Sequence, residues 1–239
     1  MKLLSFFLLL ISLNIWATNL NPRELLIKSD QARGGLNHGV RWKVKIETYS
    51  NEEKSESQYN IKVKATNILA VCDFPPRQKG ETFLFNDKNL WVYRPNLKKP
   101  ISISSRQKLS GQTANGDIAA INYSKDYEAT YISEEKVNGT LAAKLLLKAK
   151  STDSTYDKIN YWIELKSGLA VKAEYLNSDN TPIKTALFFY ENQFHGVPFI
   201  SKMEIIDSQF SNNKSILIYE NIIEENLNDS IFNVNNLSR

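Results

Sequence analysis

The sequence predicts a mainly β protein: a strongly curved antiparallel sheet that forms an incomplete β-barrel, with a short helical lid. Residues 41–47 alternate between charged and apolar without exception, so Trp42, Val44 and Ile46 share one face of a half-buried strand. Comparable segments recur between turn signals, with little amphipathic helix between them. Consecutive hairpins of this length favour a curved sheet or open barrel. Its apolar face must be covered, either by the protein's own core or by a bound lipid.

The first 17 residues are predicted to be a signal peptide. Lys2 precedes an apolar run over residues 3–13, and Ala17 is the expected cleavage site. The run is about half as long as the roughly 20 residues of a membrane-spanning helix. We therefore expect the mature chain to be secreted. Residues 18–239 are expected to form a single domain, because no Pro- or Ser-rich linker interrupts them.

A short helix is expected at the start of the mature chain. Asn21 is a good N-cap, Pro22 suits the first turn, and residues 34–35, both glycine, end the helix. Leu25 and Leu26 form its apolar side, which suits a helix that lies over a sheet. The first run of strands is expected near residues 40–50, 57–66, 68–74, 81–86, 89–94 and 100–104.

A second helical piece and a second run of strands are expected in the rest of the chain. Residues 115–117 open a short helical segment, with Asp117 as its cap. Strands resume near Glu128. Residues 138–139, Asn-Gly, are the strongest hairpin signal, because a type I′ turn requires positive φ at both central positions. Residues 187–190 are apolar on both faces, which indicates that some strands are covered on both sides.

Charge and cysteine content exclude two classes of protein. The formal net charge of +4, which falls to +3 without Lys2, is far below that of a nucleic-acid-binding surface. The single cysteine, Cys72, excludes an internal disulfide and is expected to be a buried thiol that packs as a small hydrophobe. A reactive thiol would need an electropositive, exposed setting, for which Arg77 and Lys79 are the nearby candidates.

The sequence pattern gives no support for catalysis or metal binding. Neither His38 nor His195 lies in a metal-ligand spacing or a nucleophile motif, and residues 195–196 indicate a turn. Adjacent glutamates such as residues 134–135 alternate across a strand, so they are not an acid/base couple. No Gly-rich phosphate loop or Cys/His cluster occurs. We therefore predict that the protein is not an enzyme and uses no cofactor or metal.

Several blocks of the sequence resemble one protein family. They are ELLIKSDQARGG at residues 24–35, NLWVYRPNLKKP at 89–100, WIELKSGLAVKAEY at 162–175 with residues 184–190 after it, and DSIFNVNNL at 229–237. These look like the outer-membrane lipoprotein-sorting proteins of the LolA-like superfamily, and the similarity spans almost the whole mature chain. The resemblance implies an unclosed barrel with a helical lid and an apolar cavity for acyl chains, in a Gram-negative periplasm.

The predicted binding residues are of two kinds. Aliphatic and aromatic strand residues are expected to line an apolar cavity: Trp42, Val44, Ile46, Ile61, Phe83, Phe85, Trp91, Tyr93, Leu145, Leu147 and Phe189. Residues 88–116 contain no acidic residue, and their cations are expected to attract a lipid head group or an acidic partner: Lys88, Arg94, Lys98, Lys99, Arg106 and Lys108. The alternatives are a packed core for the first set and a solvated basic hairpin for the second.

The leading prediction is a periplasmic carrier or chaperone that binds the acyl chains of a lipoprotein or lipid and passes them toward the outer membrane. Exposing a chain of roughly 16 carbons to water costs on the order of 12 kcal/mol, so such cargo needs enclosure. We expect a monomer with an inner-membrane transporter as donor and an outer-membrane acceptor, and no nucleic acid. Three alternatives stay open: an interaction or sensor module that binds a membrane-protein partner without lipid transfer, an outer-membrane barrel, and a lipid-modifying enzyme.

Overall fold

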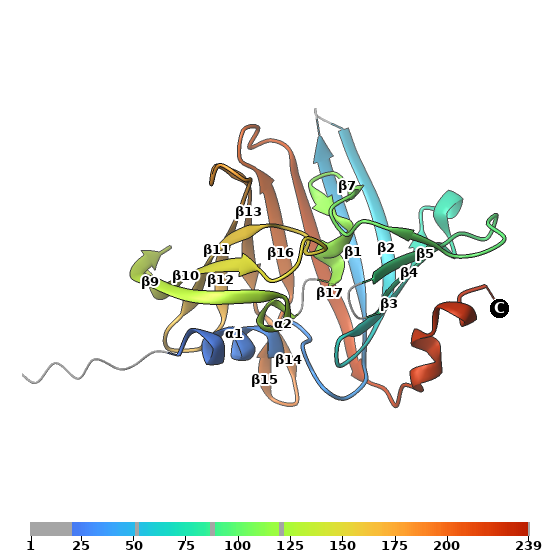
Figure 1. Ribbon diagram of the computed structural model, residues 1–239, viewed down its shortest axis with the longest axis horizontal. Helices are drawn as coiled ribbons and strands as arrows, with labels where there is room; N and C mark the ends of the chain where they lie inside the picture. The colour runs from blue at the N-terminus through green and yellow to red at the C-terminus, as the bar shows by residue number, and fades with distance from the viewer. Residues whose placement is uncertain (1–20, 51–52, 87–88, 120–121, 239) are drawn as a thin grey trace, which may run out of the picture.

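Most of the chain forms one large antiparallel sheet (Figure 1). The computed structural model describes residues 21–50, 53–86, 89–119 and 122–238, so the predicted signal peptide lies outside the described residues. Within them, the sheet has 13 strands in the order β6 (Ile101–Ile103), β5 (Asn89–Tyr93), β4 (Thr82–Asn86), β3 (Asn67–Phe74), β2 (Glu53–Lys64), β1 (Val40–Ser50), β17 (Lys214–Glu224), β16 (Lys202–Asp207), β13 (Pro182–Phe189), β12 (Ala170–Leu176), β11 (Lys158–Glu164), β10 (Thr140–Ala149) and β9 (Tyr127–Val137).

The sheet does not close into a barrel. Its two edge strands, β6 and β9, are at opposite ends of the strand order and do not pair with each other. In Figure 1 the half from β9 to β12 lies on the left and the half from β2 to β5 on the right. This confirms the predicted fold class, a mainly β, unclosed antiparallel sheet with a short helical lid.

Strand β17 joins the two halves. It follows all the other strands in the sequence, yet it lies in the middle of the sheet between β1 and β16. On one side Tyr219 is opposite Val44 of β1, and on the other Leu217 is opposite Met203 of β16. Among the described residues, the pairing of β1 with β17 is therefore the one strand pairing that joins the two halves.

The alternation predicted for β1 is confirmed. Val40, Trp42, Val44 and Ile46 are buried on one face, whereas the side chains between them are partly or fully exposed. Strands β9 and β10 are joined by the predicted tight turn at residues 138–139, where φ is +49° and +84°. Period-two patterning and turn chemistry thus placed these strands correctly.

The remaining elements are short. Two small hairpins pair β7 (Lys108–Ser110) with β8 (Thr113–Ala114), and β14 (Asn192–Phe194) with β15 (Val197–Phe199). The α-helices of the described residues are α1 (Pro22–Gln31) and α2 (Tyr123–Asp126), and the 3₁₀ helices are η1 (Pro76–Gln78), η2 (Asn115–Ala119), η3 (Asp229–Phe232) and η4 (Val234–Asn236). None of the helices in this part of the chain has the length and apolar character needed to cross a membrane.

Helix α1 begins as the sequence predicts. The Asn21 side chain accepts a hydrogen bond of 3.0 Å from the Arg23 N–H, and Pro22 occupies the first turn. After the helix, Gly34 adopts a φ of +107°, and a Cβ there would lie 2.6 Å from the Trp42 ring. Gly34 is therefore required both for its backbone conformation and for the close approach of the tryptophan.

The last described residues cover the outer face of one half of the sheet. Leu227 and Phe232, from the segment that contains η3, pack with Leu84 of β4 in a second apolar cluster, and Trp91 of β5 packs against it. Strands β4 and β5 are consequently apolar on both faces. Figure 1 shows this segment, in red, beside β3 and β4.

Cys72 is buried in β3, as predicted. Its Sγ donates to the carbonyl oxygen of Phe74 at 3.2 Å. Burial raises the pKa of the thiol to about 11, and the nearby charge of Glu81 acts in the same direction. The thiol is thus protonated at neutral pH, and the charged groups that raise its pKa, Glu81 and Asp73, are acidic, which is the opposite of the electropositive setting of a reactive thiol.

Candidate functional site

The inner face of the sheet is covered by short segments rather than by a second sheet. These segments are α1, the stretch from β7 to η2, and α2, and together they are called the lid here. Leu26 of α1, Ile118 of η2 and Tyr123 of α2 are all buried in the same apolar core as the inward-facing strand residues. Figure 1 shows α1 and α2 beneath the β9–β12 half and β7 beside β1. The lid therefore completes the core.

A buried carboxylate connects the two helices of the lid. Asp30 of α1 accepts hydrogen bonds from the backbone N–H groups of Tyr123, at 3.1 Å, and Ser124, at 2.8 Å, at the start of α2. Burial raises the pKa of Asp30 to about 6, although Arg33 and these N–H groups act in the opposite direction. The neighbouring Ser29 shares a hydrogen bond of 2.8 Å with the Tyr161 hydroxyl, which ties α1 to β11.

A buried arginine lies between the lid and the sheet. The Arg33 guanidinium lies 4.4 Å from the centre of the Tyr123 ring and 5.2 Å from that of Phe188, and its Nη2 is 3.4 Å from Asp30 Oδ1. Its Nε has no hydrogen-bond partner among the described residues, and the same is true of Trp42 Nε1. The covered interior thus contains N–H donors that are buried but not satisfied.

A second buried carboxylate holds the middle of the lid. Asp117 of η2 accepts hydrogen bonds from the Ala114 N–H at 2.7 Å and from the Tyr156 hydroxyl at 2.9 Å. The sequence predicted Asp117 as the N-cap, but η2 begins at Asn115 and Asp117 lies inside it. Its carboxylate instead reaches back to the β7–β8 hairpin and across to Tyr156. Burial raises its pKa, which Lys184 partly counteracts. Lys184, in β13, also donates a hydrogen bond of 2.6 Å to the carbonyl of Gln112, between β7 and β8. This contact attaches the lid directly to the sheet.

Tyrosine rings fill the interior between these groups. The Tyr156 and Tyr175 rings stack with their centres 4.0 Å apart, and the Tyr175 hydroxyl is 3.2 Å from that of Tyr123. Tyr123 in turn packs edge-on against Tyr127 and Tyr161. With the lid in this position, the space under it is therefore occupied by the protein's own side chains.

A groove of about 410 Å³ opens where the two ends of the sheet approach each other. One wall comes from β4, β5, β6 and the loop after β6, and the other from α2, the start of β9 and the loop between β10 and β11. Its lining is part apolar and part polar, and it includes Phe85, Leu90, Ile103, Tyr127 and Lys150. This size lies within the range of small-molecule sites.

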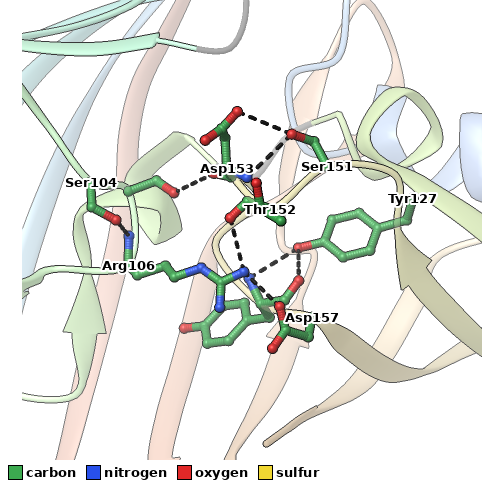
Figure 2. Close-up of polar contacts among 9 residues, drawn as sticks. Ser104, Arg106, Tyr127, Ser151, Thr152, Asp153 and Asp157 are labelled. Atoms are coloured by element: carbon green, nitrogen blue, oxygen red, sulfur yellow. Dashed lines mark hydrogen bonds and ion pairs between the residues drawn. The ribbon is translucent and has the colours of Figure 1, made fainter. Parts of the chain in front are cut away.

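Polar contacts bridge the groove (Figure 2). Arg106, after β6, donates to Asp157 Oδ1 at 2.6 Å and to the Thr152 carbonyl at 3.1 Å. Ser105 Oγ donates to the carbonyl of Asp153 at 3.0 Å. Figure 2 shows these groups meeting from opposite sides, with Tyr127 nearby. The contacts connect the ends of a sheet whose edges do not pair, and they are called the strap here.

Most of the residues predicted to line a cavity lie under the lid, but as a packed core. Seven are buried there: Trp42, Val44, Ile46, Ile61, Phe83, Leu145 and Leu147. Phe85 is half-buried against this core and lines the groove. Contact of these residues with an acyl chain stays a prediction.

Three of the predicted cavity residues are on the other face of the sheet. Trp91 packs into the outer cluster with Leu84, and Tyr93 alternates with the buried Val92 and so points outward with Trp91. Phe189 also points outward, because its neighbour Phe188 is in the core and Lys202 lies 4.0 Å from its ring centre. Their assignment to the inner face was wrong, because these strands have apolar residues on both faces and alternation does not identify the inner one.

The predicted basic tract is less uniform than its sequence indicates. Arg94 pairs with the buried Glu81 at 2.6 Å, and Arg106 pairs with Asp157 at 2.6 Å. Carboxylates from other parts of the chain therefore compensate both charges, which corrects the expectation of a free basic surface. Lys98 and Lys99 are exposed. Lys88 lies outside the described residues, as does the side chain of Lys108.

Solved structures share this architecture. A LolA superfamily protein from Nitrosomonas europaea is 25% identical, with a TM-score of 0.83 over 90% of this chain and 98% of its own. A putative outer membrane lipoprotein-sorting protein domain from Vibrio parahaemolyticus is 20% identical, with a TM-score of 0.77 over 91% and 98% of the two chains. A DUF1329 family protein from Desulfovibrio piger is 17% identical, with a TM-score of 0.77 over 90% and 97%.

The fold is therefore the LolA-like open barrel, and the resemblance found in the sequence is confirmed. Residues 64–239 match a family model described as "Uncharacterized protein". The chain belongs to this family, within the LolA-like superfamily. No curated protein matches the sequence.

The sequence did not reveal the polar groups under the lid. Asp30, Arg33 and Tyr123 come from positions up to 93 residues apart, and no spacing rule connects them. One signal was available: the chain has 11 tyrosines, and several lie next to apolar strand residues. Buried tyrosines need partners for their hydroxyl groups, so a polar network in the core was a reasonable expectation.

Proposed function

We propose that the protein is a periplasmic carrier or chaperone that binds the acyl chains of a lipoprotein or lipid under the lid and passes them toward the outer membrane. One observation carries the proposal: short segments, instead of a second sheet, cover the apolar inner face of the curved sheet. Segments of this kind open locally at lower free-energy cost than a sheet. The names of the Nitrosomonas and Vibrio structures agree with this class of function.

Binding would exchange lid contacts for contacts with the guest. Moving Leu26, Ile118 and Tyr123 off the sheet exposes large apolar side chains, at about 1.5 to 3 kcal/mol each, or roughly 5 to 9 kcal/mol together. A guest chain recovers about 0.8 kcal/mol for each methylene that it buries. A chain of roughly 16 carbons therefore gains only a few kcal/mol net. A carrier needs this balance, because an acceptor must be able to remove the cargo.

Two unpaired N–H donors in the interior are consistent with a guest that contains carbonyl groups. Arg33 Nε and Trp42 Nε1 are buried donors without partners, and each such group costs about 1 to 3 kcal/mol. Ester or amide carbonyls of an acylated molecule are acceptors and would satisfy them. The groove at the ends of the sheet, with its mixed lining, suits the polar end of the same guest.

The test is identification of bound lipid. Native mass spectrometry of protein purified gently from its own cells should show acylated molecules of defined mass. The delipidated protein should then bind a fluorescent acyl probe, which unlabelled fatty acid displaces. Protein that carries no lipid and binds no probe would exclude the carrier function.

The filled interior favours one second candidate, an interaction or sensor module that binds a membrane-protein partner without lipid transfer. Its support is that Tyr161, Tyr175 and Trp42 are fully buried under the lid, as in an ordinary core. Cross-linking in the periplasm followed by mass spectrometry distinguishes the two. A module gives one stable protein partner and no lipid, whereas a carrier gives lipid together with transient donor and acceptor contacts.

The proposed cycle consists of binding and release by a monomer, without catalysis and without a cofactor. An inner-membrane transporter would supply the cargo, an outer-membrane acceptor would receive it, and nucleic acid has no part. Hydrolysis of acyl esters by the pure protein would contradict this and would restore the lipid-modifying enzyme as a candidate.

A further inference from the structure

Two histidines that are far apart in the sequence meet at one end of the sheet. The chain contains only two, His38 and His195, and in the structure they lie together with Glu224. One potential ligand atom from each of the three side chains lies within 4.8 Å of the other two, and His195 Nε2 is 2.9 Å from Glu224 Oε2. All three side chains are exposed. Spacing in the sequence gave no indication of this cluster.

Ordered backbone positions each of the three residues. His38 precedes β1, in a loop whose Gly39 carbonyl accepts a hydrogen bond of 2.9 Å from the Glu225 N–H. His195 is in the tight β14–β15 turn, with a φ of +50°. Glu224 is the last residue of β17. The Phe194 ring stacks on His38 and contacts His195 edge-on, with centres 5.8 and 4.3 Å apart.

We propose that His38, His195 and Glu224 form a binding site for a divalent transition-metal ion, with Zn²⁺ as the ion that suits it. Two imidazoles and a carboxylate are a ligand set that Zn²⁺ accepts, at distances of about 2.0 to 2.2 Å, with a fourth position for water. Tetrahedral binding requires ligand atoms about 3.4 Å apart. Exposed side chains reach that spacing from 4.8 Å by small rotations. Hard cations such as Mg²⁺ prefer oxygen ligands and do not suit the site.

The position of the site gives the ion a structural role. The Ile200 N–H, next to β15, donates to the Ala32 carbonyl at the end of α1 at 2.9 Å. A metal ion on His38 and His195 would connect the loop that leads from α1 to β1 with the β14–β15 hairpin and the end of β17. It would therefore fix the point where the lid helix joins the sheet. This inference does not depend on the proposed carrier function.

The experiment is titration of the metal-free, untagged protein with Zn²⁺ by isothermal calorimetry. One ion per chain should bind, and His38→Gln, His195→Asn and Glu224→Gln should each weaken the affinity by at least about tenfold. Asparagine is chosen at position 195 because it tolerates positive φ. Glu191→Gln, an exposed glutamate close to the same hairpin, is the matched control and should bind as the wild type does.

Two further measurements separate a built site from surface binding. Zn²⁺ should raise the melting temperature of the wild type and of Glu191→Gln but not that of the His38→Gln/His195→Asn double variant. Co²⁺ should give visible absorption bands with the wild type that the double variant lacks. Zn²⁺ binding that is equal in the wild type and the double variant, or no binding at all, would overturn the proposal.

Discussion

Phe85 and Phe189 show how one residue type serves different purposes on the two faces of the sheet. Phe85 packs against the core and lines the groove, whereas Phe189 faces outward next to Lys202. Both are half-buried. They therefore make a matched pair for separating an effect on binding from an effect on stability.

We expect Phe85→Ala to weaken binding of a fluorescent acyl probe by about tenfold, which corresponds to about 1.4 kcal/mol of lost apolar contact. Phe189→Ala should leave probe affinity unchanged, because its ring lies on the opposite face. Fluorescence titration measures both affinities, and circular dichroism checks the fold. Equal effects of the two substitutions would show that the groove is not part of the binding site.

Asp30 is expected to make the stability of the protein depend on pH. Because its pKa is about 6 in the folded protein and 3.8 ordinarily, the folded state binds its proton more readily than the unfolded state. The free energy of unfolding should therefore fall as pH rises from about 4 to about 6, by on the order of 2 to 3 kcal/mol. Carboxylates whose pKa is lowered in the folded protein have the opposite effect. Glu47, whose pKa falls from 4.5 to about 2, makes the free energy of unfolding decrease as pH falls through that range.

Urea unfolding at pH 4.5 and pH 7 tests this. The wild type should gain stability on acidification relative to Asp30→Asn, which carries no titrating group at position 30. The Asp30→Asn variant is expected to be less stable overall, since an amide cannot accept both N–H groups of α2 as the carboxylate does, but the readout is the difference between the two pH values. The same pH dependence in both proteins would contradict the raised pKa.

The lid is the element on which the proposed function depends, and it can be locked. A Cβ at Gly116 of η2 would lie 3.0 Å from Thr155 Cβ in the β10–β11 loop, somewhat closer than the separation of about 3.5 to 4.5 Å in a disulfide. We expect Gly116→Cys/Thr155→Cys to form a disulfide after a small backbone adjustment. The oxidised protein should lose acyl-probe binding, and dithiothreitol should restore it.

Cys72 does not interfere with this measurement, because it is buried and protonated. The control is the Thr155→Cys single variant, which cannot form the cross-link and should bind the probe with and without reductant. If the oxidised double variant binds the probe as tightly as the reduced one, this part of the lid does not need to move.

At the level of elements, the sequence predicted strands better than it predicted faces. Alternation placed β1 and its inner residues because the outer face of β1 is charged. In β4 and β5 the C-terminal segment covers the outer face, so apolar residues occur on both faces and Trp91 was assigned to the wrong one. The tyrosine content indicated a buried polar network, but its members could not be predicted, because Asp30 and Tyr123 are brought together only by the tertiary fold.

At the level of the whole molecule, the strap holds together two ends of a sheet that do not pair. The ion pair between Arg106 and Asp157 is exposed, so we expect Asp157→Asn to change the free energy of unfolding by no more than about 1 kcal/mol. Hydrogen exchange of residues 104–106 and 151–157 should nevertheless accelerate, because the contacts across the groove are lost.

Lys54→Gln is the control, because it removes a different ion pair, between the exposed Lys54 and the partly buried Glu47 on the β1–β2 hairpin. Exchange in the groove segments should be unchanged in this variant. Exchange that is equally slow in Asp157→Asn would mean that packing alone keeps the two ends of the sheet together.

The central place of β17 has a consequence for how the chain is made. Strands β1 to β6 form one half of the sheet, and β9 to β13 with β16 belong to the other. One edge of β1 pairs with β2, but its other edge stays unpaired until β17 has been synthesised. Pairings between such distant parts of a sequence form slowly. A polypeptide with this topology stays unfinished until its final strand emerges from the ribosome.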